Sequence, residues 1–256
     1  MSWLFGIPFV LLAALFVASV LGAMEVGHKL SRFAPVDEQL GSTISAPLVG
    51  LVALLLAFSF SMAGERHALR REAAVREANS IGTFWLRTSL LPEPTRSEMQ
   101  SRVRLYVDLH LEHRAARIDE TRTLALEGEA RRLQQELWTL LTEDARRAPE
   151  SSRLRLVTPA LNAMIDDAAS VLSAGENRLP EPIFLYLFLL VGIAGVVIGY
   201  RPGGEKRNLI LWVLFATVVS GVLVVLIDMD NPRRGLIQTS VAPYLRLRGS
   251  MQGSPP

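Results

Sequence analysis

The chain has 256 residues, half of them hydrophobic, with a formal net charge of +2 at pH 7 and no cysteine. Without cysteine it can form no disulfide, no thiolate zinc site and no cysteine nucleophile. The small net charge gives no argument for a nucleic-acid partner, and none is expected.

Four long apolar runs, none containing Asp, Glu, Lys or Arg, stand out along the chain. They are Trp3–Met24, Gly41–Gly64, Pro182–Tyr200 and Leu209–Ile227. Each is close to the roughly 20 residues that a membrane-spanning helix needs. The first run lacks a Lys/Arg n-region and a good cleavage site, so it predicts a span rather than a signal peptide. The sequence therefore predicts an integral membrane protein with the lipid bilayer as its solvent.

The runs divide the chain into four parts. These are 1–64 with the first two transmembrane helices (about 3–24 and 41–64), a helical region at 65–181, residues 182–227 with the last two helices (182–200 and 209–227), and a tail at 228–256. Lys and Arg are more frequent on the face that carries both termini and 65–181 than in the two loops opposite. That bias predicts cytoplasmic termini and a cytoplasmic 65–181 region in the plasma (inner) membrane. We expect His28 to be a solvated loop residue and the end of the tail, from Gly249, to be disordered.

The region 65–181 shows helical periodicity and no strand pattern. A capping box at Thr95–Glu98 follows Pro94 and predicts a helix start. An apolar stripe runs through 119–147, and Thr158 with Pro159 predicts another start, as N-cap and first helical residue. The fold class is therefore all-α: four transmembrane helices with a cytoplasmic helical bundle between the second and third.

The second span and the charged segment after it form one predicted helix, because no proline lies between Pro47 and Pro92. Small residues recur on one face of this span at a spacing of three or four. Two interpretations are open: tight packing against another helix, or a pore wall in which an aromatic residue makes an apolar constriction. The candidate pore-lining residues are Ala46, Gly50, Ala53, Ala57, Phe58, Phe60 and Ser61.

Arg66, Arg70 and Arg71 follow directly where the helix is expected to leave the membrane. Such a collar would make a cytoplasmic mouth electropositive and concentrate anions there. In the third span, Gly195 and Gly199 form a GxxxG pair, which predicts close approach of a neighbouring helix.

No ionisable residue lies within the four runs, which argues against proton relays and intramembrane proteases. No catalytic constellation or phosphate-binding loop is present, so we expect neither an enzyme nor a cofactor. His110 and His113 have a spacing that could hold a metal, but a polar helix face produces the same pattern. Asp228 and Asp230 are the weak alternative for a calcium site. No metal is predicted.

Several segments together resemble the bestrophin-like domain family. They are Gly50–Ala63, Arg70–Arg71, Glu77–Thr83 with Glu77, Asn79 and Gly82, then Leu86–Arg87, Leu90–Pro92, Arg96, Tyr106–Asp108, Asp228, Pro232 with Gly235–Ile237, Ser240 and Pro243. The Glu77–Thr83 run is the most specific of them, and the resemblance covers nearly the whole chain.

The family's link to true bestrophins implies cytoplasmic termini, homo-oligomers (pentamers in bestrophins), a pore lined by the second span, and a permeant anion such as chloride. The chain departs from bestrophins in its neck, where Ile44 and Pro47 only loosely match their Ile-Pro, and in its sparse acidic residues after the fourth span. The resemblance therefore does not extend to calcium gating. The leading hypothesis is an oligomeric anion channel. The alternative is a membrane-anchored interaction or sensory protein whose helical bundle binds a partner without conductance.

Overall fold

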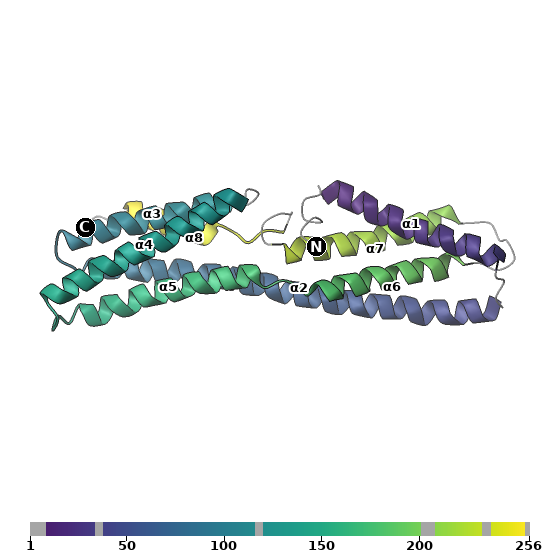
Figure 1. The fold of residues 1–256 in the computed structure, drawn as a ribbon, viewed down its shortest axis with the longest axis horizontal. Helices are drawn as coiled ribbons and strands as arrows, with labels where there is room; N and C mark the ends of the chain where they lie inside the picture. The colour runs from purple at the N-terminus through teal and green to yellow at the C-terminus, as the bar shows by residue number, and fades with distance from the viewer. Residues whose placement is uncertain (1–8, 34–37, 116–119, 201–207, 232–236, 254–256) are drawn as a thin grey trace. The chain divides into compact units, whose positions relative to one another are not determined.

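The computed structural model describes residues 9–33, 38–115, 120–200, 208–231 and 237–253. Every regular element in these ranges is an α-helix (Figure 1). The helices are α1 (Phe9–Phe33), α2 (Glu38–Thr88), α3 (Thr95–Ala115), α4 (Glu120–Arg147), α5 (Leu154–Glu176), α6 (Glu181–Gly199), α7 (Leu209–Asp230) and α8 (Ala242–Gly253). Four helical stretches are long and apolar enough to cross a membrane. The predicted all-α class with four candidate spans is confirmed.

The chain folds as two compact units. Unit 1 comprises residues 1–67 and 178–237, and unit 2 comprises residues 68–177 and 238–256. Helix α2 is continuous and contributes its first part to unit 1 and its second part to unit 2. The predicted long helix is thus confirmed, including its passage through Pro47. The cytoplasmic location of the second unit stays a prediction.

The core of unit 1 is apolar and is supplied by α1, α2, α6 and α7. Helices α1 and α6 approach so closely that a Cβ added at Gly199 would collide with the backbone of Met24. At Gly195 an added Cβ would lie 3.0 Å from the Cβ of Ala23. The close approach predicted for this GxxxG pair is therefore confirmed, whereas Gly192 has no atom within 4 Å of an added Cβ.

The prediction that His28 is a solvated loop residue is wrong. Helix α1 continues to Phe33, and His28 is 5% exposed. Its ring meets Trp212 edge-on, with ring centroids 6.1 Å apart. The physical reason is spacing: His28 follows the buried Val20 and Met24 at intervals of four, so it lies on the same helix face.

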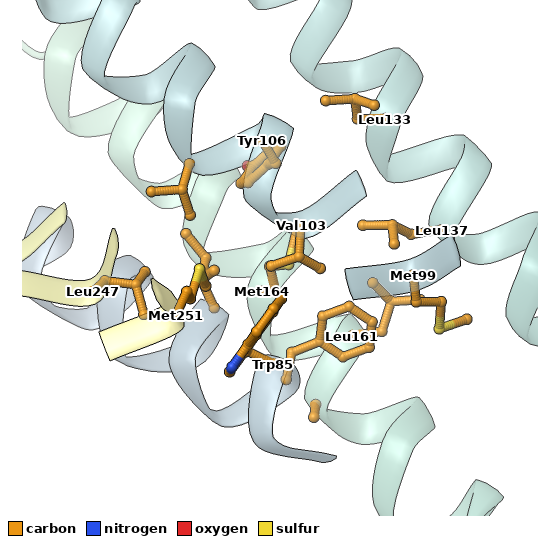
Figure 2. Close-up of a cluster of buried hydrophobic side chains, with 14 of the residues drawn as sticks. Trp85, Met99, Val103, Tyr106, Leu133, Leu137, Leu161, Met164, Leu247 and Met251 are labelled. Carbon is orange, nitrogen blue, oxygen red and sulfur yellow. The ribbon is translucent and has the colours of Figure 1, made fainter. Parts of the chain in front are cut away.

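The core of unit 2 is built by the second part of α2 together with α3, α4, α5 and α8. Figure 2 shows Trp85, Val103, Tyr106 and other buried side chains meeting between these helices. Helix α3 begins at Thr95, as the capping pattern predicts. Helix α5 begins at Leu154, earlier than the predicted Thr158, because the fully buried Val157 holds the first turn in the core.

The end of the tail is helical rather than disordered over residues 249–253, which belong to α8. Three buried side chains of this helix, Tyr244, Leu247 and Met251, pack into the core of unit 2. They recur at intervals of three and four, which places them on one helix face. The expectation of disorder from Gly249 onward does not hold for these residues, because Met251 anchors the last turn.

Candidate functional site

The small-residue face of α2 in unit 1 is not covered by the described part of the chain. The residues of α2 that unit 1 buries are Val52, Leu56, Ser59 and Ala63. The candidate pore-lining residues Ala46, Gly50, Ala53, Ala57, Phe58, Phe60 and Ser61 are all exposed. A Cβ added at Gly50 meets no atom within 4 Å. The face therefore makes no tight packing with the described residues and is open to lipid, water or another copy.

The exposed surface of α2 divides into two halves at about 100° per residue. Ala53 and Ala57 belong to a half made of small side chains, whereas Leu51 and Phe58 lie about 100–120° from the middle of that half, among large apolar side chains. Phe60 lies closer to the small half than Phe58 does, on the opposite flank. Of the two predicted constriction residues, Phe60 is thus the one whose ring can reach a lumen in front of the small half.

The three arginines after the span have different surroundings. Arg70 is 5% exposed, and its guanidinium donates to the carbonyl oxygens of Ala174 at 3.1 Å and Asn177 at 2.8 Å. It therefore satisfies carbonyls at the C-terminal end of α5, where a cation is favoured. Arg66 is half-buried and Arg71 is exposed. Arg71 is the member of the predicted collar whose charge is most open to solvent.

The family run Glu77–Thr83 carries a fully buried carboxylate, that of Glu77. Tyr106 Oη donates to its Oε1 at 3.2 Å, and Tyr244 Oη donates to its Oε2. His110 Nε2 lies 3.2 Å from Oε1. Gln134 Nε2 donates to Tyr106 Oη at 2.9 Å, which leaves the phenolic proton free to point at Glu77. Burial, and then the charge of Glu77, raise the pKa of Tyr106 well above its usual value, so this hydroxyl stays a donor.

The other two motif residues differ from Glu77. Gly82 allows α8 to approach, since an added Cβ there would lie 3.2 Å from Leu247 Cδ1. Asn79 is exposed, and its backbone carbonyl accepts a hydrogen bond from Thr83 Oγ1 at 3.0 Å. Sequence reasoning missed Tyr244 as a partner of Glu77. The available signal was that the motif acid falls on the buried face of α2, where it requires donors from another element.

The side chains considered as candidate metal ligands make hydrogen bonds or ion pairs with other protein groups. Asp228 accepts from the backbone amide of Ile237 at 2.9 Å, and Asp230 accepts from that of Leu179 at 2.8 Å. His113 Nε2 lies 3.4 Å from Glu127 Oε1, so its acidic partner differs from that of His110. Among the residues that the structure describes, no group of three or more His, Cys, Asp or Glu side chains could hold a metal ion.

The fold and these features define an integral membrane protein with four candidate spans and a second, helical unit. The family model of the Bestrophin-like domain matches residues 10–244. The chain belongs to the Bestrophin-like domain family, as the sequence resemblance indicates.

Solved structures with the same fold are similar to this chain at low identity. A variant of a bacterial bestrophin homolog from Klebsiella pneumoniae has a TM-score of 0.70 and 14% identity, covering 94% of this chain and 97% of that one. A structure of a bacterial bestrophin homolog from the same organism, solved by zinc phasing, has a TM-score of 0.69 and 12% identity, covering 97% and 100%. A variant described only as a membrane protein has a TM-score of 0.69 and 14% identity, covering 96% and 99%. No curated protein matches.

Proposed function

We propose that this protein is a homo-oligomeric anion channel in which the small half of α2 lines the pore. The observation that carries the proposal is the uncovered small face of α2, in a chain of the Bestrophin-like family. A helix that buries one face in its own subunit and leaves small side chains on another leaves room for a lumen when copies surround an axis. A pentamer, as in bestrophins, is the subunit number that the family suggests.

Charge supports an anion as the permeant species. Arg71 is exposed beyond the apolar run and lies 18 residues, or about five helical turns, after Ala53, so it falls on the small half of α2. Arg66 lies about 140° round the helix from Arg71 and outside that half. Repeated around an axis, the guanidinium group of Arg71 forms a positive ring that raises the local concentration of chloride. The four apolar runs offer no carboxylate or amine that could carry protons across the membrane. Passive conduction is therefore the transport mode that these residues fit.

The test is chloride flux from liposomes that contain the purified protein, with subunit number determined from particle images of the same preparation. Ala53→Phe narrows the proposed lumen and is expected to reduce flux about tenfold or more. Leu51→Phe is the control, because it places the same ring on an exposed position about 120° round the helix from the middle of the small half, and it should leave flux nearly unchanged.

A ring of subunits with α2 at the axis and chloride flux that depends on Ala53 would support the channel. A monomer or dimer that stays silent in every salt would instead favour the membrane-anchored interaction protein. Equal loss of flux in both variants would contradict the proposal that the small half of α2 lines the pore.

A further inference from the structure

Helix α8 depends on its docking site in order to fold. It spans Ala242–Gly253, close to the lower limit of about 12–15 residues at which an isolated helix is marginal in water. Its buried face carries Tyr244, Leu247 and Met251. Outside that face, Arg248 pairs with Asp108 at 2.8 Å, but both side chains are about half exposed and such pairs contribute little. Loss of the buried contacts would therefore release α8 by local unfolding.

Glu77 is the polar centre of that docking site. A fully buried carboxylate is costly unless hydrogen bonds and a counter-charge compensate it. Tyr244 of α8 supplies one hydrogen bond, and Tyr106 of α3 supplies another. Among the described residues, the partner of Glu77 that can carry a positive charge is His110 of α3, with its Nε2 at 3.2 Å from Oε1.

His110, on α3, contacts one aromatic ring of its own helix and one of α8. Its ring stacks on Tyr244, with centroids 5.3 Å apart and planes 4° from parallel, and meets Tyr106 edge-on at 4.5 Å. A protonated imidazole in this position interacts with the carboxylate of Glu77 and, as a cation over an aromatic face, with the ring of Tyr244. A neutral imidazole loses both charge interactions.

Other charged groups nearby are paired among themselves. On α3 and α4, His113 faces Glu127 at 3.4 Å, and Asp108 on α3 pairs with Arg248 of α8. From α4, the neutral Gln134 reaches the cluster through Tyr106. In the part of the chain that the structure describes, titratable groups in contact with His110 include Glu77 of α2, its α3 neighbour Tyr106 and Tyr244 of α8.

We propose that Glu77, His110 and Tyr244 form a proton-controlled latch that fastens α8 to α2 and α3. Protonated His110 compensates Glu77 and holds α8 in place. As pH rises through the titration of His110, Glu77 loses its counter-charge and α8 loosens, because a group that gains its partner when protonated stabilises the docked state on the acidic side. The latch concerns docking within unit 2 and stands whether or not the protein conducts ions.

The test is hydrogen–deuterium exchange of the full chain in lipid nanodiscs at about pH 6 and about pH 8.5, the interval over which histidine loses its proton. Rates are corrected for the intrinsic effect of pH on amide exchange. Protection of the α8 amides is expected to fall at least about fivefold at the higher pH, which is the upper end for an exposed ion pair, because the carboxylate of Glu77 is fully buried. His110→Gln keeps a neutral donor but cannot be charged, so it should remove this step. His113→Gln, on the same helix with its own acid, should keep it.

A second variant tests the latch if His110→Gln disturbs folding. The sequence has no cysteine, so Gly82→Cys with Leu247→Cys introduces its only two thiols, at a place where an added Cβ at Gly82 lies 3.2 Å from Leu247 Cδ1. Oxidation should fix α8 and abolish the pH step, and reduction should restore it. Equal protection of α8 at both pH values in the natural protein, or an undiminished step after His110→Gln or in the oxidised pair, would overturn the latch.

Discussion

Arg70 and Asn177 are joined by a hydrogen bond of 2.8 Å from the guanidinium Nη2 to the backbone carbonyl oxygen. The same guanidinium reaches Ala174 through Nε, so one side chain of α2 satisfies two carbonyls at the C-terminal end of α5. Arg70 and Asn177 are 107 positions apart in the sequence. An arginine that composition alone assigns to an anion-attracting mouth thus has a structural task, and this separates it experimentally from Arg71.

Arg70→Met should destabilise unit 2 by about 1–3 kcal/mol, because it leaves the carbonyls of Ala174 and Asn177 without their donor. The measurement is denaturant or thermal unfolding of the detergent-solubilised protein followed by circular dichroism. Arg71→Met removes the same charge from an exposed site and should change stability by no more than about 0.5 kcal/mol. Equal losses in the two variants would contradict the structural role of Arg70.

Arg71→Glu should reduce the preference for chloride over potassium, on the order of threefold, because it reverses an exposed charge in the proposed ring. Reversal potentials in asymmetric salt across a planar bilayer measure this preference. Arg131→Glu makes the same change in net charge at an exposed site on α4 and is the matched control. Unchanged reversal potentials in Arg71→Glu would show that Arg71 does not act at the mouth of the proposed pore.

Phe60→Ala should raise single-channel conductance about twofold or more, because Phe60 flanks the small half of α2 where its ring can narrow the lumen. Phe58→Ala removes the same ring from the half with large apolar side chains and should have a much smaller effect. Bilayer recordings of both variants under one salt condition decide between the two residues. A larger increase in Phe58→Ala would mean that the pore faces the other half of the helix.

Sequence patterns predicted the features that depend on neighbours within one segment. The four apolar runs, the continuous α2 and the glycine pair at Gly195 and Gly199 each follow from composition and helical spacing alone. Features that depend on distant partners were not predicted. The bond between Tyr244 and Glu77 joins residues 167 positions apart, and Tyr244, Leu247 and Met251 of α8 pack into a core built mainly by helices distant in the sequence.

His28 illustrates the same limit at short range. Its polarity and its place after the first apolar run suggested a loop, yet spacing from Met24 carries it onto the buried face of α1. The segment has no proline before Pro35 to end the helix. Periodicity was therefore the better guide than hydropathy at this helix end.

The crossing of α1 and α6 gives the sharpest packing test in unit 1. Gly199→Val should destabilise the unit by several kcal/mol, because the new side chain collides with the backbone of Met24, which no rotamer change can relieve. Gly192→Val adds the same group on α6 where nothing lies within 4 Å, and because Val has a higher helix propensity than Gly, stability should be unchanged or slightly raised. Thermal stability in detergent, read as the fraction that stays monodisperse by size exclusion after heating, measures the difference. A Gly199 variant as stable as the Gly192 variant would show that α6 does not approach the backbone of Met24 on α1 at Gly199.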